Sequence, residues 1–203
     1  IQTTNISDDY DYDYDYEEQD KESIEFNNHI FMLSQFQHST IIKFFGFSKQ
    51  DFKGNKRYTI FMEYAEYGSL DKILDKIRQS IAPIDYEQQK CPIILIGIAR
   101  SMMLLHKHKI IHGDLKPSNI LLDKNYLPKL TDFQDSRVEN TQITYTTLYS
   151  APEVLLNLQF SEKSDVFSFG IIMYEVITNL FPYSDLINRS YQVSQNIING
   201  DRP

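Results

Sequence analysis

The segment "IIHGDLKPSNILL", at residues 110–122, carries four polar functional groups between two apolar ends. The groups are an imidazole, a carboxylate, an amine and an amide, supplied by His112, Asp114, Lys116 and Asn119. Asp132 ends a second short segment, "PKLTD", which we expect to pair as a strand with "NILLD". This pairing would gather two carboxylates, an amide and an amine, which suit Mg²⁺ and a transferring phosphoryl group.

The composition of the chain fits a globular domain. Of its 203 residues, 41% are hydrophobic and 24% are charged, which is enough apolar content for a core. The formal net charge of −8 argues against a nucleic-acid-binding surface, so no nucleic-acid partner is expected. Cys91 is the only cysteine, which excludes a disulfide within the chain and favours a cytoplasmic setting. No signal peptide is visible, and the apolar runs are shorter than the ~18 residues of a membrane span.

The stretch "DDYDYDYDYEEQD" at residues 8–20 is strongly acidic, with eight Asp or Glu among thirteen residues. Alternation of Asp and Tyr has the period of a strand, but like charges on one face would repel each other in a sheet. We therefore interpret residues 1–24 as an acidic, Asp/Tyr-rich disordered segment. The alternative is an acidic docking or modification segment built on its tyrosines, Tyr10, Tyr12, Tyr14 and Tyr16.

Ordered structure is predicted from about residue 25 onward. The stretch "FNNHIFMLSQF" places Phe26, Ile30 and Leu33 on one face of a helix. Two strands are expected in "IIKFFGFS" and "RYTIFMEY", joined by the turn "KQDFKGNK". A short amphipathic helix should follow Ser69, which we assign as its N-cap.

Two longer helices are predicted in the second half of the chain. The first spans roughly residues 86–109 and has an apolar stripe. The stripe consists of Cys91, Leu95, Ile98, Met102 and Leu105. The second helix, "SDVFSFGIIMYEVIT", is apolar nearly all round, so we expect it to be buried at the centre of the domain.

Several of these segments together resemble a protein kinase domain of the tyrosine-kinase-like group, whose members mostly phosphorylate Ser and Thr. "HGDLKPSN" resembles the catalytic loop H-R-D-x-K-x-x-N, and "DFQ" from Asp132 resembles the D-F-G motif. "APE" at residues 151–153 matches as it stands, and "DVFSFG" from Asp165 resembles the central-helix motif D-V-W-S-F-G. "HIFMLSQFQHSTIIKFFGF" is similar to the region of the family's C helix, and the order and spacing agree over roughly residues 25–203. Lys116, with Thr146 in "TYTTLYSAPE", indicates the Ser/Thr type.

The resemblance implies an α+β, protein-kinase-like fold. Residues 25–64 would form a truncated N-lobe, consisting of the C helix and two strands. Residues 65–203 would form a mostly helical C-lobe that ends after the region of the family's G helix.

The resemblance also assigns roles at an ATP and Mg²⁺ site. Asp114 would accept the proton of a substrate hydroxyl, and Lys116 would contact the γ-phosphate. Asn119 and Asp132 would hold Mg²⁺. The adenine would lie against a hinge whose members are Met62, as gatekeeper, and the backbone of Glu63 and Ala65.

Further residues would have structural or regulatory roles by the same resemblance. A hydrophobic spine joining the lobes would consist of Leu33, Phe44, His112 and Phe133. Asp165 would anchor the catalytic loop through backbone amides. Thr146 and Glu153 would belong to the activation segment, and a protein substrate or signalling partner would bind beside it.

The chain departs from the family pattern at several positions. Residues 1–25 contain no glycine and one lysine, Lys21, so neither a glycine-rich phosphate loop nor the nucleotide-binding lysine is identified. His29 takes the place of the glutamate that pairs with that lysine, Gly113 replaces the arginine of H-R-D, and Gln134 replaces the glycine of D-F-G. We therefore expect no catalysis by this chain alone and weak Mg²⁺–ATP binding. The alternatives are a pseudokinase scaffold or signalling module, and a gene fragment without a stable fold.

Overall fold

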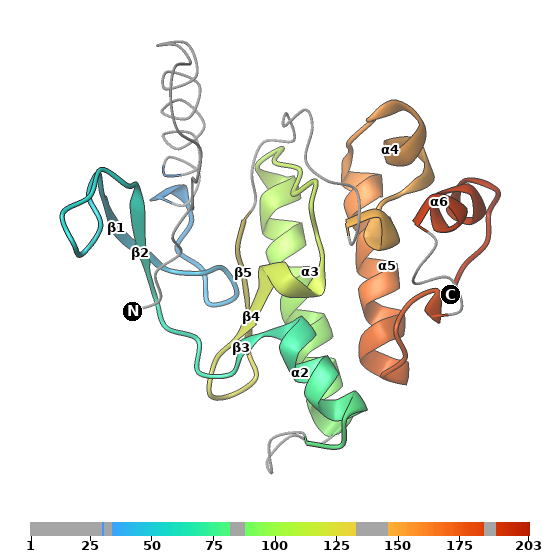
Figure 1. Cartoon of the computed structure of the whole chain (residues 1–203), viewed down its shortest axis with the longest axis horizontal. Helices are drawn as coiled ribbons and strands as arrows, with labels where there is room; N and C mark the ends of the chain where they lie inside the picture. Colours follow the sequence, from blue (N-terminus) through green and yellow to red (C-terminus); the bar gives the residue numbers. More distant parts are fainter. Residues whose placement is uncertain (1–29, 31–33, 82–87, 133–145, 185–189) are drawn as a thin grey trace.

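The computed structural model describes residue 30 and residues 34–81, 88–132, 146–184 and 190–203. A small sheet, β1–β2, lies at one end of the molecule, and the two long helices, α3 and α5, stand side by side nearer the middle (Figure 1). Helix α6 lies on the far side of α5 from α3, and α4 lies beyond the upper end of α5 (Figure 1). This mixed arrangement of small sheets and several helices confirms the predicted α+β fold.

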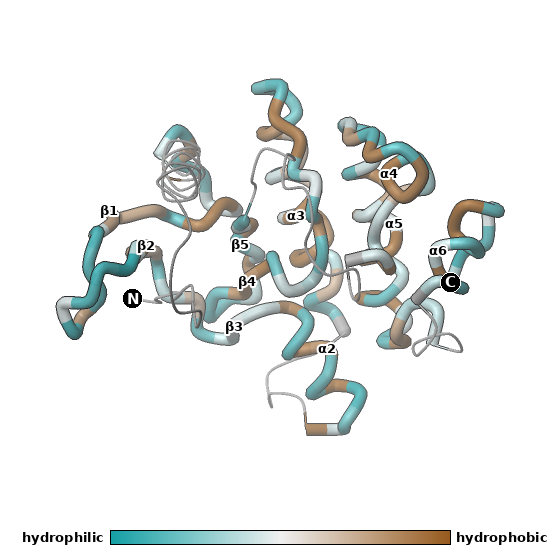
Figure 2. Tube along the Cα trace, turned by 45° about the horizontal axis from the view of Figure 1, so that its top comes forward, coloured by the Kyte–Doolittle hydropathy of each residue, from teal (hydrophilic) through white to brown (hydrophobic). Residues whose placement is uncertain are grey.

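Strands β1 (Phe44–Ser48) and β2 (Thr59–Met62) form an antiparallel hairpin, as the two apolar runs predicted. The turn between them is fixed by Asp51, whose Oδ1 accepts the backbone N–H groups of Lys53 at 2.8 Å and Asn55 at 2.9 Å. This is the hydrogen-bonding habit that makes Asp frequent in turns. Figure 2 shows that the connection between the two strands is mostly hydrophilic.

A second sheet has the order β3–β4–β5 and supports the loop of interest. It consists of β3 (Gly68–Ser69), β4 (Ile120–Leu122) and β5 (Pro128–Leu130), all antiparallel. The predicted pairing of the two short strands is confirmed, with Leu121 opposite Lys129. Every β4 side chain is buried. The sheet therefore gives the end of the 110–122 segment a fixed position.

The segment that precedes β1 is tied to this sheet and to α3. The N–H of Ile42 donates to the carbonyl of Leu130 at 3.0 Å, and the N–H of Leu130 donates to the carbonyl of Thr40 at 2.8 Å. The buried hydroxyl of Ser101, on α3, donates to the same Thr40 carbonyl at 2.7 Å. These bonds satisfy buried backbone groups and connect the hairpin end of the molecule to its helical part.

The helices begin near the predicted positions. They are α2 (Leu70–Arg78), α3 (Cys91–Lys107), α4 (Pro152–Asn157), α5 (Glu162–Thr178) and α6 (Ser190–Ile198). Short 3₁₀ turns are η1 (Gln88–Lys90), η2 (Pro117–Asn119) and η3 (Thr146–Tyr149). Ser69 occupies the N-cap position of α2 as predicted, but its side chain makes no capping hydrogen bond. Ser161 does cap α5, because its side chain accepts the N–H of Ser164 and the Ser164 hydroxyl accepts the N–H of Ser161.

The two long helices form the centre of the core, with one difference from expectation. The α3 stripe is confirmed for Cys91, Ile98, Met102 and Leu105, while Leu95 is only half-buried. Helix α5 packs against α3, yet Val166 is 58% exposed and Ile177 is 50% exposed, so this helix is not buried all round as predicted. Its buried face instead includes polar residues, which are Ser164, Asp165, Ser168 and Glu175.

Part of the sequence prediction falls outside the described residues. The acidic stretch 8–20 and most of the helix predicted around residues 26–36 belong to this part. Ile30 is described, and it is half-buried and packs against the core as its place in the apolar pattern predicted.

Gly97 sets the distance between α3 and β5. A Cβ atom at this position would lie 2.3 Å from Cγ and 2.5 Å from Cδ of Pro128. Because the ring of Pro128 is fixed to the β5 backbone, the strand or the helix would have to move. The contact requires a residue without a side chain.

We expect Gly97→Ala to lower the free energy of unfolding by about 1–3 kcal/mol through this overlap. The matched control is Gly170→Ala in α5, where a Cβ would meet nothing within 4 Å. The control should be neutral or stabilising by up to about 1 kcal/mol, since Ala is a better helix former than Gly. Chemical denaturation measures the free energy of unfolding of both variants. Equal changes in the two variants would show that α3 and β5 can accommodate a Cβ atom at residue 97.

Candidate active site

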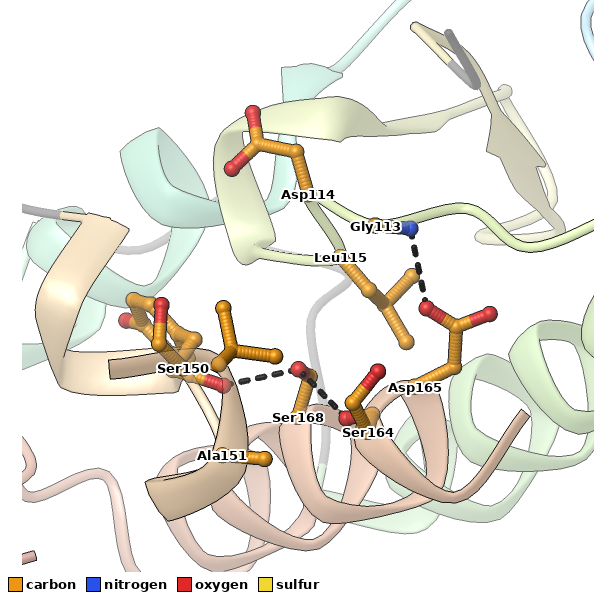
Figure 3. Close-up of a pocket in the computed structure, with 10 residues that line it drawn as sticks. Gly113, Asp114, Leu115, Ser150, Ala151, Ser164, Asp165 and Ser168 are labelled. Atoms are coloured by element: carbon orange, nitrogen blue, oxygen red, sulfur yellow. Dashed lines mark hydrogen bonds between the residues drawn. The ribbon is translucent and has the colours of Figure 1, made fainter. Parts of the chain in front are cut away.

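The 110–122 loop is held from below by the buried carboxylate of Asp165, on α5. Its Oδ1 accepts the N–H of Gly113 at 3.0 Å, and its Oδ2 accepts the N–H of His112 at 2.9 Å. Oδ2 also lies 2.8 Å from Nε2 of His106, on α3. Figure 3 shows Asp165 directed at the Gly113 amide, while the Asp114 side chain points the other way. The anchoring expected for Asp165 is therefore observed.

Gly113 occupies a backbone conformation that suits its residue type. Its φ is +75°, in the left-handed region where residues with a Cβ atom are strained. The glycine that replaces the family arginine therefore adopts this turn without that penalty.

His112 is fully buried and is hydrogen-bonded at both ring nitrogens. Its Nε2 lies 3.1 Å from the carbonyl of Thr131, which can only accept, so Nε2 carries the proton. Its Nδ1 accepts the N–H of Asp114 at 3.3 Å. Burial lowers the pKa of His112, although the neighbouring carboxylates of Asp165 and Asp114 oppose this shift. The ring is thus neutral and fixes the turn that leads to Asp114.

Three of the predicted site residues meet directly. Nζ of Lys116 lies 2.7 Å from Oδ2 of Asp114, and Nδ2 of Asn119 donates to the same oxygen at 3.1 Å. Nδ2 of Asn119 also donates to the Asp114 carbonyl at 2.9 Å. Oδ1 of Asp114 is shielded and has no hydrogen-bond partner among the described residues. Oδ2 of Asp114 is therefore engaged by two donors, while Oδ1 is enclosed in this conformation.

Asp132 lies next to this cluster through the backbone. The N–H of Thr131 donates to the carbonyl of Asn119 at 3.0 Å, which brings the end of β5 to the catalytic loop. Asp132 is exposed and has a φ of +57°. Among the described residues, no three His, Cys, Asp or Glu side chains gather closely enough to hold a metal ion. The amide oxygen of Asn119 and the carboxylate of Asp132 are nevertheless ligands of the type that Mg²⁺ takes, because this ion completes its coordination shell with phosphate oxygens and water.

The predicted hinge follows β2. Met62 is buried, and the side chain of Glu63 is held by the N–H of Lys43 at 2.8 Å and by Nζ of Lys129 at 3.2 Å. Among the described residues, the backbone hydrogen bonds outside helices and strands do not include the carbonyl of Glu63 or the N–H of Ala65. By the sequence resemblance, the backbone of Glu63 and Ala65 is the part of the hinge that would meet an adenine ring.

The other predicted positions are only partly described. Phe44 is half-buried against the core, and Glu153 lies in the first turn of α4. Thr146 begins η3. Several predicted or substituted positions lie outside the described residues, and these are His29, Leu33, Phe133 and Gln134.

A buried ionic cluster beside the site was not predicted from the sequence. Glu175, on α5, is 1% exposed and is contacted by a guanidinium nitrogen of Arg78, on α2. Its Oε2 accepts the hydroxyl proton of Tyr149 at 2.6 Å. Burial raises the pKa of Glu175 and, with the charge of Glu175, that of Tyr149. The cluster links α2, α5 and the turn before "APE".

Sequence signals for the missed residues existed but were weak. Glu175 is the one acidic residue inside the apolar run "GIIMYEVIT". A charge in such a run indicates a buried partner, because an unpaired buried charge is strongly unfavourable. Nothing in the spacing identified Arg78, which lies 97 positions away. His106 precedes the loop by only a few residues and showed no pattern of its own.

A small cavity separates the catalytic loop from the segment that contains "APE". Its lining includes Gly113, Leu115, Ala151 and Ser168, and about 10 Å³ is accessible to the centre of a water molecule (Figure 3). The hydroxyl of Ser168 closes one side by donating to the carbonyl of Tyr149 at 2.7 Å. The loop and the "APE" segment are thus packed closely, with room for about one water.

The loop, its anchor and the neighbouring strands form the kind of site that the sequence resemblance assigned to protein kinases. A family model described as protein kinase domain matches residues 14–200. The chain belongs to the protein kinase domain family.

Similar proteins from Arabidopsis thaliana agree with this assignment. Cysteine-rich receptor-like protein kinase 8 is 39% identical over 166 residues, and Cysteine-rich receptor-like protein kinase 27 is 37% identical over 166 residues. G-type lectin S-receptor-like serine/threonine-protein kinase SD1-13 is 36% identical over 166 residues. Each alignment covers 76% of this chain but 23%, 25% and 19% of these relatives, respectively. The chain therefore spans about a quarter or less of their length.

The buried neutral His112 should make stability depend on pH. Its folded-state pKa lies below the ordinary 6.5, so the unfolded chain binds a proton that the folded chain excludes. Its contribution is fully present above pH 6.5 and falls below it, by up to about 1.4 kcal/mol per pH unit. Urea unfolding at a series of pH values should show a shallower acid dependence in His112→Gln. The exposed His108→Gln is the control, and equal slopes in the two variants would contradict the assignment.

The buried cluster predicts a larger effect on stability. Arg78→Leu leaves the Glu175 carboxylate without its cation, so we expect a loss of about 3–5 kcal/mol in the free energy of unfolding. Adding Glu175→Gln should recover much of this loss, because the neutral amide still accepts the Tyr149 hydroxyl. Asp75→Asn is the control, since this exposed partner of Arg78 should contribute less than about 1 kcal/mol. If the losses in free energy of unfolding of the two single variants add up to the loss in the double variant, Arg78 and Glu175 act independently.

Proposed function

We propose that this chain presents the metal-binding and substrate-facing part of a Ser/Thr protein kinase site, binds Mg²⁺–ATP weakly, and does not catalyse phosphoryl transfer by itself. The observation that carries the proposal is the cluster in which Lys116 and Asn119 both contact Oδ2 of Asp114. The family supports ATP and Mg²⁺ as ligands. Similarity to the serine/threonine-protein kinase SD1-13 supports the Ser/Thr type.

In this proposal each residue of the site has a separate role. The carboxylate of Asp114 accepts the proton of a substrate hydroxyl. Lys116 neutralises charge on the phosphoryl group, and Asn119 with Asp132 holds Mg²⁺. The metal supplies charge neutralisation between the nucleotide phosphates. Asp165 and His112 act by positioning, because their hydrogen bonds fix the backbone on which Asp114 stands.

The absence of autonomous catalysis follows from what residues 1–25 of this chain lack. They contain no glycine and only Lys21, and His29 cannot supply the carboxylate that pairs with a phosphate-gripping lysine. Positioning and charge neutralisation provide nearly all of phosphoryl-transfer catalysis. Their loss should reduce the rate by several orders of magnitude, although a nucleotide could still bind at the hinge and at Mg²⁺.

A scaffold or signalling module is the second candidate. Gly113 favours it, because the family arginine at this position pairs with a phosphorylated activation segment, and glycine has no charge to offer. The partner would then be a signalling protein. A cytoplasmic setting is part of both proposals, and the buried thiol of Cys91 is compatible with it.

An activity assay tests the catalytic part of the proposal. The purified chain with Mg²⁺ and labelled ATP should transfer no measurable phosphate to a generic protein rich in Ser and Thr. Transfer that Asp114→Asn abolishes would overturn this expectation. Transfer that survives in Asp114→Asn would indicate a contaminating kinase.

A thermal-shift titration tests nucleotide binding separately. ATP with Mg²⁺ should raise the Tm of the chain, since a ligand that binds only the folded state stabilises it. The shift should shrink without Mg²⁺ and in Asp132→Asn, with Asp123→Asn, a turn residue in the connection from β4 to β5, as the matched control. No shift under any condition would favour the scaffold.

A further inference from the structure

The β1–β2 hairpin carries a concentration of positive charge that the kinase site does not use. Residues 43–57 contain five cationic side chains, all on exposed residues, and one acidic residue, Asp51. The cations are Lys43, Lys49, Lys53, Lys56 and Arg57. Among the described residues, none of the five charged side-chain groups lies within 4 Å of a carboxylate oxygen. We call this surface the basic hairpin face.

The single acidic residue of the hairpin, Asp51, offsets only one of the five positive charges. Oδ1 of Asp51 accepts the backbone N–H groups of Lys53 and Asn55, and Oδ2 accepts the Asn55 side-chain amide at 2.8 Å. The side-chain hydrogen bond from Asn55 is the main reason why the pKa of Asp51 lies below its usual range. Asp51 therefore serves the turn, and the five cations face solvent on a shaped and ordered loop.

Aromatic rings lie among these charges. Phe52, at the turn, is 77% exposed, and Phe45 and Phe47, on β1, are 54% and 45% exposed. Nζ of Lys43 lies 5.4 Å from the centroid of the Phe45 ring. The ring of Phe52 packs edge-on against Phe61 of β2, with 5.9 Å between the ring centroids, so Phe45 and Phe47 are the exposed rings beside the lysines that flank β1. Exposed apolar side chains on a charged surface mark a contact surface. A ligand for this face should therefore offer both anionic groups and apolar or aromatic groups.

The chain contains a segment with this composition. Residues 8–20 contain eight acidic residues, four tyrosines and no Lys or Arg, so the segment has a charge of −8. The whole chain also has a net charge of −8, which leaves a formal charge of zero for the rest. The acidic segment thus carries all the excess negative charge, and the basic hairpin face carries a local excess of four positive charges on a neutral remainder.

The connecting chain is long enough for the two to meet within one molecule. Asp20 lies 14 positions before Ser34, where continuous description of the structure begins. At about 3.3 Å per residue, this stretch spans up to roughly 45 Å. The hairpin begins only ten positions after Ser34, at Phe44. An intramolecular contact also has the advantage of a high effective concentration.

We propose that the acidic segment, residues 8–20, docks on the basic hairpin face of the same molecule. Its carboxylates pair with the lysines and arginine, and its tyrosine rings contact the exposed phenylalanines. An anionic lipid surface shares part of this chemistry, but the acidic segment would compete with it for the same cations.

Paramagnetic relaxation enhancement on the full chain tests the proposal. A spin label is attached to Gln19→Cys in a Cys91→Ser background, and amide signals are recorded in the isotope-labelled protein. We expect residues 45–57 to lose most of their signal intensity, while α3 and α5 keep theirs. Lys53→Glu with Lys56→Glu should restore the hairpin signals, whereas the control pair Lys72→Glu with Lys163→Glu, on α2 and α5, should not.

Salt and mixing experiments distinguish the other occupants. The loss of amide signal intensity in residues 45–57 should disappear in roughly 0.5 M NaCl, where charges more than about 4 Å apart are screened. Broadening in a mixture of spin-labelled and isotope-labelled molecules would assign the contact to a second copy and overturn the intramolecular proposal. Uniform broadening over the molecule, or none, would also overturn it. Added phosphatidylserine vesicles that bind the hairpin without competition from the segment would assign the face to a membrane instead.

Discussion

The loop that carries the candidate active site depends on one buried carboxylate. Asp165 comes from a helix more than forty residues later in the chain, and it accepts hydrogen bonds from two successive backbone amides and from the His106 ring. Without Asp165, the buried N–H of His112 and the partly buried N–H of Gly113 would lose this acceptor, at a cost in free energy. Because both lie immediately before Asp114, the helical core sets the position of the Asp114 backbone. The neutral ring of His112 fixes the same turn from the side of β5.

A second buried carboxylate organises the other side of the site. Glu175 lies ten positions after Asp165 on α5, and it joins α2 to the turn that precedes "APE" through Arg78 and Tyr149. Helix α5 therefore has two tasks, since its apolar residues complete the core and its two acidic residues position loops from widely separated parts of the chain.

The sequence predicted the elements whose signal is local. The hairpin strands, the α3 stripe and the β4–β5 pair follow from periodicity and residue type, and the Asp114, Lys116 and Asn119 cluster follows from spacing on one loop. The prediction failed for α5, because an apolar run does not reveal which of its faces lies in the core. It also missed the Arg78–Glu175 pair, since two single charges 97 positions apart leave no pattern. At Ser69, the residue type correctly predicted where α2 begins, but it did not predict that the Ser69 side chain makes no capping hydrogen bond.

Gly113 has a consequence for engineering. Restoring the arginine typical of the family would put a Cβ-bearing residue at a φ of +75°, in a conformation that disfavours such residues by about 1–2 kcal/mol. The two hydrogen bonds from backbone N–H groups to Asp165 would then have to hold a strained turn in place. At present they hold a turn without this strain. A designer who wishes to make this loop responsive to a phosphorylated activation segment would therefore have to reinforce its anchor before changing its charge.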